Sequence, residues 1–418
     1  MPDQTEFVFH TVESNTLTSE RQTKMKIVML TWEYPPRIIG GISRVVEGLS
    51  RSLVELGHEV HVITNEMPGS PSEDIDRGVF VHRVQIETPS PSFHTWVLMM
   101  NNYFSKRLGR LAREIGRPDI IHVHDWLVYP AGAEAKAFLD SVLVSTLHSL
   151  EFRRSGGIQT PESKMIDSLE WWITFETSII IVCSNSMKFD AVKQFRVPED
   201  KILVIPIGIE PDKFTHIQVD REQIHGKYAI HPNEKLILFV GRLTNQKGCE
   251  YLIKALSYVA NYFSVKLVIV GDGYQRAELE VLARTSGVGD RVRFLGFVPD
   301  DDLNRLLLAA DVMAIPSVYE PFGVVALEGM AAGVPIVASD VDGLGEVIKH
   351  EENGIAVFAR DPSSIAWGIS RILSDPGNTQ RLVHNARKDI QSRFSWQSVA
   401  RLTLMAYQKA LDLQHKHG

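Results

Sequence analysis

The sequence has little cysteine, no long hydrophobic run and no excess of positive charge. Its 418 residues include 2 cysteines, Cys183 and Cys249, too few for a disulfide scaffold or a cysteine-built zinc site. We therefore expect a reducing, cytoplasmic setting. Apolar runs such as Leu236–Val240 have the length of a strand, far short of the ~20 residues that cross a bilayer. The N-terminal residues lack the pattern of a secretory signal, whereas a few exposed basic or apolar side chains would suffice for peripheral membrane contact.

The charge balance argues against a protein dedicated to nucleic acid. The net charge is −7, so no global positive field attracts a phosphate backbone. A local basic site for a small phosphate ligand is still compatible with this composition. The hydrophobic share of 44% and the charged share of 23% are typical of globular proteins, and the length predicts two or three domains.

Short apolar runs alternate with amphipathic stretches in two consecutive series, which predicts parallel βαβ units. The expected strands of the first series are Lys26–Thr31, Glu59–Thr64, Ile120–Val123, Val142–Leu147, Ile179–Val182 and Ile202–Ile205. Those of the second are Leu236–Val240, Lys266–Val270, Val292–Leu295, Val312–Ile315 and Ile336–Ala338. The predicted fold is α/β, with two Rossmann-like, doubly wound parallel-sheet domains that face a cleft. We place a polar tail at 1–24, the two domains at 25–208 and 209–393, and a final helix at 394–418.

In open parallel sheets, ligands bind beyond the carboxyl ends of the strands. After the first expected strand, Gly40 and Gly41 allow close backbone approach, and the next helix offers free N–H groups to an anion. A tight turn is the alternative there. In the second domain, Arg242 and Lys247 flank a polar loop before a helix, which favours a diphosphate site. A solvated basic loop is the alternative for this segment.

Further loops of the second domain carry candidate ligand groups. Gly271 lies in a Gly-Asp-Gly segment that suits a ligand or a plain turn, and Gly296–Val298 is an apolar edge that suits a nucleotide base. Glu320 precedes an apolar helix that carries Glu328, roughly on the same side. A carboxylate deep in such a helix is costly unless it binds a ligand or forms an internal salt bridge.

Histidines end two strands of the first domain. His122 and His124 precede Asp125, and His148 begins a segment that ends at Glu151. Strand alternation places the first two on one side, which suits either cleft lining or ordinary packing. The absence of a further His or Cys at ligand spacing argues against a metal site.

Three segments together resemble a retaining nucleotide-sugar glycosyltransferase of the GT-B fold and the family 4 type. They are EYPPRIIGG at Glu33–Gly41, GRLTNQKG at Gly241–Gly248, and the long run from Glu320 to Glu346. The resemblance covers Lys26 to Tyr407. It implies that the first domain binds the acceptor, that the second binds the donor, and that the last helix crosses back to the first domain.

Two further segments resemble glycogen synthases and other α-glucan synthases. They are HVHDW at His122–Trp126 and HSLE at His148–Glu151. The implied catalytic residues are His148, Glu320, Arg242 and Lys247. The implied donor-binding residues are Gly40, Gly41, Arg242, Lys247, Gly271, Phe297, Val298, Glu320, Phe322, Gly323, Val324, Val325 and Glu328. The implied acceptor-side residues are His124, Asp125, Trp126 and Glu151.

The resemblance implies no metal and no cofactor, with an ADP- or UDP-sugar and a glycan acceptor as partners. The main hypothesis is glucosyl transfer from ADP- or UDP-glucose to an α-glucan. Hexosyl transfer to a lipid-linked or small-molecule acceptor is the alternative. A nucleotide-sugar 2-epimerase is an alternative of another class, which would need further acid and base groups to break a C2–H bond.

Overall fold

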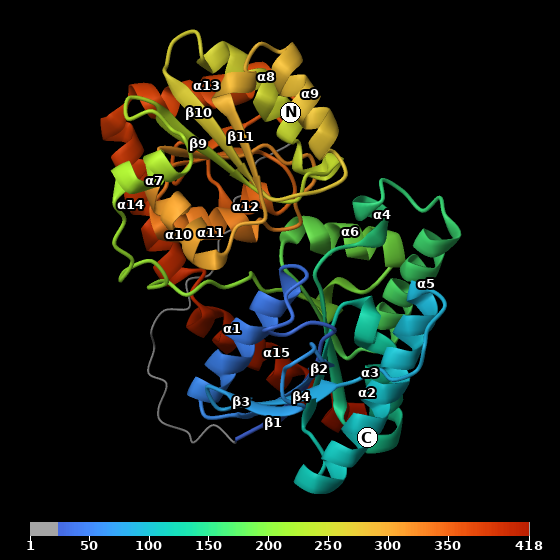
Figure 1. The fold of residues 1–418 in the computed structure, drawn as a ribbon. Helices are drawn as coiled ribbons and strands as arrows, with labels where there is room; N and C mark the ends of the chain where they lie inside the picture. Colours follow the sequence, from blue (N-terminus) through green and yellow to red (C-terminus); the bar gives the residue numbers. More distant parts are fainter. Residues whose placement is uncertain (1–23, 418) are drawn as a thin grey trace, which may run out of the picture.

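The computed structural model describes residues 24–417 as two α/β domains, one above the other (Figure 1). The predicted two-domain, parallel-sheet fold is confirmed. The predicted polar tail lies outside the described residues, except for Lys24. Among residues 24–417, no helix combines the length and the apolar character needed to cross a membrane.

The first domain contains an eight-stranded sheet in the order β3-β4-β2-β1-β5-β6-β7-β8, in which only the edge strand β3 is antiparallel. Its strands are β1 (Lys26–Leu30), β2 (Glu59–Asn65), β3 (Glu73–Asp76), β4 (Val79–Val84), β5 (Ile120–His124), β6 (Val142–Leu147), β7 (Ile179–Val182) and β8 (Ile202–Val204). Its helices are α1 (Ile42–Glu55), α2 (Phe93–Ile115), α3 (Tyr129–Leu139), α4 (Glu151–Arg154), α5 (Pro161–Glu176) and α6 (Asn185–Phe195).

The second domain contains a six-stranded, all-parallel sheet in the order β11-β10-β9-β12-β13-β14. Its strands are β9 (Lys235–Val240), β10 (Val265–Val270), β11 (Val292–Gly296), β12 (Val312–Ile315), β13 (Ile336–Ser339) and β14 (Ile355–Val357). The helices that follow β8 are α7 (Arg221–Lys227), α8 (Cys249–Val259), α9 (Arg276–Thr285), α10 (Asp300–Ala309), α11 (Val324–Ala332), α12 (Leu344–Val347), α13 (Pro362–Ser374), α14 (Pro376–Ser392) and α15 (Trp396–His417).

Strand alternation in β1 divides the first domain into two packed layers. Ile27 and Met29 face a core shared with α1 and α15, whereas Val28 and Leu30 face a core shared with α2 and α3. All four side chains have no exposed surface. Burial on both faces explains why the strand is a continuous apolar run.

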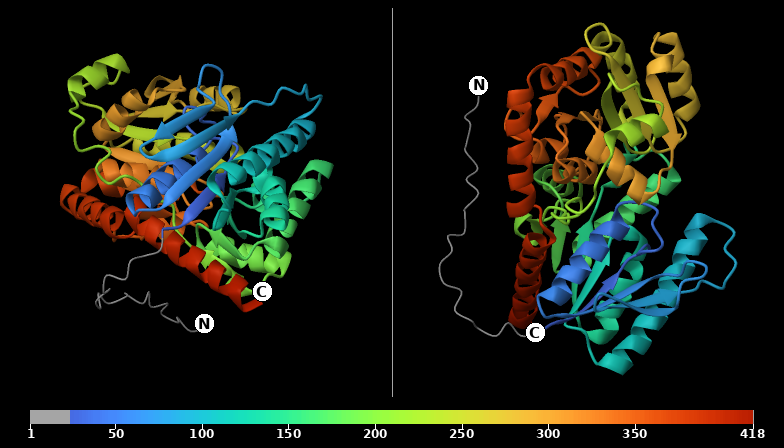
Figure 2. Two further views of the ribbon diagram at one scale, coloured as in Figure 1. Left: turned by 90° about the horizontal axis from the view of Figure 1, so that it is seen from below. Right: turned by 60° about the vertical axis from the view of Figure 1, so that its left-hand side comes forward.

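The chain passes between the domains twice, and the two passages lie side by side. The Ile209 N–H, after β8, donates to the Phe394 carbonyl oxygen at 2.7 Å, and Ile209 forms a parallel bridge with Ser395. The helices α14 and α15 meet here and run along one side of both domains (Figure 2). Trp396 packs so closely on Gly48 that a Cβ there would lie 2.1 Å from its ring. This paired passage is suited to act as a hinge.

Candidate active site

A cleft of about 1300 Å³ separates the two domains, and the ends of both sheets contribute to its lining. Many of the residues predicted to bind the donor or to act in catalysis line it. They are Gly40, Gly41, Arg242, Lys247, Glu320, Phe322, Gly323, Val324, Val325, Glu328 and His148. Asp125 and Trp126, predicted on the acceptor side, line it as well.

The loop between β9 and α8 brings two cations to the cleft. Lys247 Nζ lies 2.5 Å from Glu320 Oε2, which also accepts from the Ser317 hydroxyl at 3.2 Å. Gly248 has φ +63°, and a Cβ there would lie 2.1 Å from the Pro316 oxygen, so the loop requires glycine. The Arg242 side chain is exposed and has no hydrogen bond or ion pair to any other described residue. Its guanidinium is therefore free to bind an anion.

Glu328 lies on the face of α11 that lines the cleft, one-quarter exposed, and not deep in the helix packing as expected. Its Oε1 is 3.2 Å from Nζ of Lys213, which comes from the segment between the domains. The prediction of a buried carboxylate was wrong because α11 packs its apolar side on α14 and, through Gly329, on Met313 of β12 and Ile336 of β13, and leaves this face open. The residue before the helix, Gly323, has φ +96° and provides no side-chain cap.

Glu328→Gln is expected to weaken nucleoside diphosphate binding about three- to tenfold, since a neutral acceptor forms weaker hydrogen bonds than a carboxylate. Stability should change little, because the lost ion pair with Lys213 is partly exposed. Calorimetric titration with ADP and UDP measures the effect, with Glu278→Gln on the exposed side of α9 as the matched control. Equal affinities for the two variants would leave Glu328 with only its ion-pair role.

On the first domain, Glu33 shapes the loop that carries Gly40 and Gly41, a role that was not predicted from the sequence. Its side chain is fully buried, and Oε2 accepts from the N–H groups of Ile39 at 2.5 Å and Gly40 at 2.8 Å. The Gly40 N–H is thus already bonded within the loop. Gly41 and the uncapped start of α1 are the parts of this loop that offer free N–H groups.

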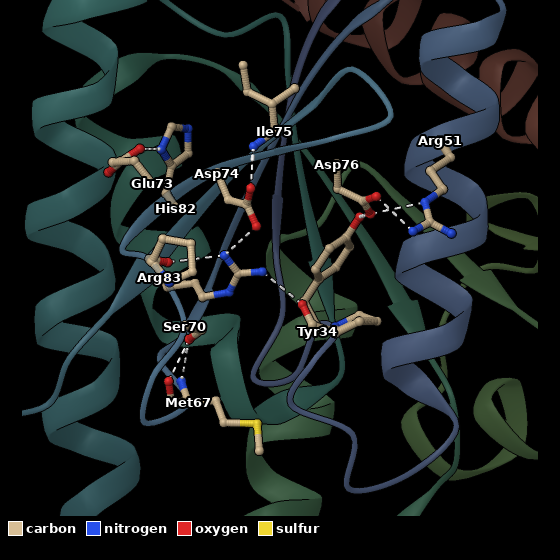
Figure 3. A network of polar contacts seen from close by, with 12 residues as sticks. Tyr34, Arg51, Met67, Ser70, Glu73, Asp74, Ile75, Asp76, His82 and Arg83 are labelled. Atoms are coloured by element: carbon tan, nitrogen blue, oxygen red, sulfur yellow. Dashed lines mark hydrogen bonds and ion pairs between the residues drawn. The ribbon is translucent and has the colours of Figure 1, made fainter. Parts of the chain in front are cut away.

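A polar network behind this loop ties it to the β3–β4 hairpin (Figure 3). The Tyr34 hydroxyl donates to Asp76 at 2.7 Å, and Arg51 makes two bonds to the same carboxylate. Arg83 donates to the Pro35 oxygen at 2.9 Å and to Asp74 at 3.1 Å. These bonds hold the backbone at the start of the loop in place.

His148 faces the second-domain cations across the cleft. Its backbone N–H donates to Asp125 Oδ1 at 2.8 Å, and Asp125 itself has φ +64°. Burial lowers the pKa of the His148 imidazole, and this effect outweighs the nearby carboxylates of Asp125 and Glu33, which raise it. His148 is therefore neutral at neutral pH. A neutral imidazole can both donate and accept a hydrogen bond.

Five of the predicted site residues do not line the cleft. His124 lies behind His148, and buried Glu151 accepts from Arg154 and Ser155. Gly271, with φ +124°, packs on the Gly241 carbonyl. Phe297 is 85% exposed outside the cleft lining, and Val298 is buried. No group of three or more potential metal ligands occurs among residues 24–417.

Comparison with known proteins agrees with this geometry. Residues 39–213 match the family described as Glycosyltransferase Family 4, and residues 220–389 match Glycosyl transferases group 1. An uncharacterized glycosyltransferase of Methanocaldococcus jannaschii is 45% identical, over 93% of this chain and 99% of its own length. The chain therefore belongs to the same family as this glycosyltransferase. A glycogen synthase of Mycobacterium tuberculosis is 35% identical, over 92% of the present chain and 94% of the synthase.

Solved structures support the same fold for this glycosyltransferase. A sucrose-phosphate synthase of Thermosynechococcus elongatus superposes with a TM-score of 0.78 at 25% identity, covering 93% of this chain and 100% of its own. The catalytic domain of starch synthase IV from Arabidopsis thaliana, bound to ADP and acarbose, reaches 0.71 at 19% identity, covering 93% and 100%.

Proposed function

We propose that this glycosyltransferase moves a glucosyl unit, with retention, from ADP- or UDP-glucose to an α-glucan. One observation carries the proposal: Arg242 and Lys247 of the second domain line the same cleft as His148 of the first. Cations on one side suit a departing diphosphate, and a neutral imidazole on the other suits an uncharged sugar. The 35% identity to a glycogen synthase supports the glucan as acceptor.

In the proposed reaction, the bond between the sugar C1 and the diphosphate oxygen breaks. The acceptor hydroxyl oxygen bonds to C1 on the same face, and its proton passes to the departing diphosphate. Arg242 and Lys247 stabilise the charge that develops on the phosphates, together with the N–H groups at the start of α11. Departure and attack on one face need no enzyme nucleophile, and two cations at the phosphates leave no need for a metal ion.

The remaining cleft residues bind hydroxyl groups in this proposal. Glu328 accepts from the two ribose hydroxyls, and Glu320 accepts from the donor sugar. Glu320 is held for this role by Lys247 and Ser317. His148 binds a sugar hydroxyl near C1.

A panel of ADP- and UDP-sugars, each with glycogen, small saccharides or no acceptor, tests the function through nucleoside diphosphate release. Release that requires ADP- or UDP-glucose and glycogen is the expected result. Release only with a small acceptor would favour the alternative transferase; a 31% identical relative from Xylanimonas cellulosilytica is named D-inositol 3-phosphate glycosyltransferase. Conversion of the free sugar nucleotide without release would indicate an epimerase and contradict the proposal.

Nucleoside diphosphate plus acceptor is expected to compact the protein, because the reacting groups are on different domains. The paired passage at Ile209 and Ser395 lets the domains rotate while each core stays packed. The contacts to adjust are a few polar ones. Glu346 accepts from the N–H groups of Asn185 and Ser186 at the start of α6. Arg44 pairs with Asp300, Arg153 pairs with Asp342, and Gln246 donates to the Arg154 carbonyl oxygen. Small-angle scattering measures the change. An unchanged radius of gyration, with binding confirmed by calorimetry, would indicate a rigid cleft.

A further inference from the structure

Three histidine rings form a row from the last helix to the cleft. His122 and His124 both belong to β5, and their ring centroids are 4.2 Å apart. His124 Nδ1 lies 3.2 Å from His148 Nε2. The first two side chains have no exposed surface, whereas His148 lines the cleft. The row therefore links a ring at the proposed reaction site to the packing of the first domain.

The inner end of the row has a defined protonation state. His122 Nδ1 is 2.7 Å from the Tyr407 hydroxyl of α15, and Nε2 is 2.7 Å from the Thr146 hydroxyl. The Tyr407 hydroxyl has no other partner within residues 24–417, so its proton is donated to Nδ1. His122 then carries its own proton on Nε2 and donates it to Thr146. Burial lowers the pKa of His122 to about 3, which keeps this ring neutral.

The contact between His124 and His148 holds a single proton, on one of two nitrogens. If this proton were on His148 Nε2, then His124 Nδ1 would be the acceptor. The neutral His124 ring would then carry its own proton on its other nitrogen, Nε2. That atom is buried and has no partner in the described chain. Buried N–H groups without an acceptor are rarer in proteins than acceptors without a donor. The proton is therefore on His124 Nδ1, which donates to His148 Nε2.

The other nitrogen of His148 is free for a substrate. Nδ1 has no partner among residues 24–417 and is not one of the buried polar atoms, so it reaches the cleft. Burial lowers the pKa of both His124 and His148, so each neutral ring has one N–H. With Nε2 of His148 accepting, its proton must be on Nδ1.

We propose that His124 is a positioning residue that holds His148 as its Nδ1–H tautomer, so that His148 presents a hydrogen-bond donor to a substrate oxygen. The inference rests on the proposed function for placing the sugar beside His148. In this tautomer, Nδ1–H of His148 donates across the cleft to an acceptor on the ligand, such as a sugar hydroxyl oxygen or a phosphate oxygen. A ring free of this constraint could offer a lone pair there instead.

Imidazole ¹⁵N spectra test the tautomer directly, because a protonated ring nitrogen and a bare one resonate far apart. The His148 signals are assigned by their loss in His148→Asn. We expect protonated Nδ1 and bare Nε2 for His148 in the wild-type protein, and loss of that preference in His124→Leu. A wild-type His148 protonated on Nε2 would overturn the proposal. This measurement needs no substrate, so it is independent of whether the glucosyl transfer is correct.

Two variants of His124 separate positioning from packing. His124→Leu removes the donor, whereas His124→Asn retains an N–H of similar reach. The leucine variant is expected to lower kcat about ten- to a hundredfold, by analogy with residues that orient metal-binding histidines. The asparagine variant should recover most of that loss, and both should bind ADP or UDP like wild type. Equal losses in two folded variants, or no loss in either, would contradict the proposal.

Discussion

Lys247→Ala is expected to lower turnover about a hundred- to a thousandfold, the usual effect of removing one preorganised group that stabilises transition-state charge. Lys247 Nζ lies in the cleft, 2.5 Å from Glu320 Oε2. In the proposed reaction it stabilises the departing diphosphate and also holds Glu320 toward the sugar. Steady-state kinetics with saturating donor measures the loss in kcat.

The substitution also leaves Glu320 without its cation, and the side chain of Glu320 is only 10% exposed. Some loss of stability is therefore expected. Lys247→Ala combined with Glu320→Gln removes that unpaired charge and should regain stability without regaining activity. Lys235→Ala, which removes an exposed lysine from Asp311 but leaves that carboxylate paired with Arg221, is the matched control and should keep full activity. Wild-type turnover in a stable Lys247→Ala protein would contradict the proposed role of Lys247 in stabilising the departing diphosphate.

The parts of the fold that the sequence predicts well are those determined by burial alone. The strands β6, β7 and β12 have the predicted bounds, since β7 and β12 are continuous apolar segments and β6 is apolar except for Ser145 and Thr146. The strands β3, β4 and β14 were not predicted. The sequence of β3 is EDID, which has no strand pattern, and its pairing with β4 accompanies bonds from Arg51 and Arg83. Those arginines lie far away in the sequence or on the partner strand, so no local pattern reveals them.

The same distinction applies to the site. Arg242, Lys247 and Glu320 could be placed together because the carboxyl ends of parallel strands meet at one edge of a sheet. The roles of Glu33 and Lys213 could not be predicted from the sequence, because each depends on a tertiary contact. Glu33 acts through the N–H groups of a loop that folds back over it, and Lys213 reaches α11 from the segment between the domains. An acidic residue before the Pro-Pro-containing loop was the only local sign of the first.

Arg242→Ala is expected to lower kcat/KM about a hundredfold or more without changing stability, which makes it the cleanest test of the diphosphate site. Unlike Lys247, Arg242 is exposed and has no partner among the described residues, so its removal leaves no buried charge unpaired. Its effect should therefore come wholly from the bound donor and the transition state. ADP and UDP should bind more weakly, and added salt should narrow the difference from wild type, because screening weakens an exposed cation.

Arg360→Ala is the matched control for this substitution. Arg360 is also exposed, also lacks a partner within residues 24–417, and lies on the second domain outside the lining of the cleft. It should retain wild-type kinetics and wild-type affinity for ADP and UDP. If Arg242→Ala matched Arg360→Ala in both measurements, Arg242 would be a solvated surface cation and the diphosphate would have to bind through Lys247 and the start of α11 alone. A loss confined to Arg242→Ala, at equal thermal stability, would instead place the leaving group beside its guanidinium.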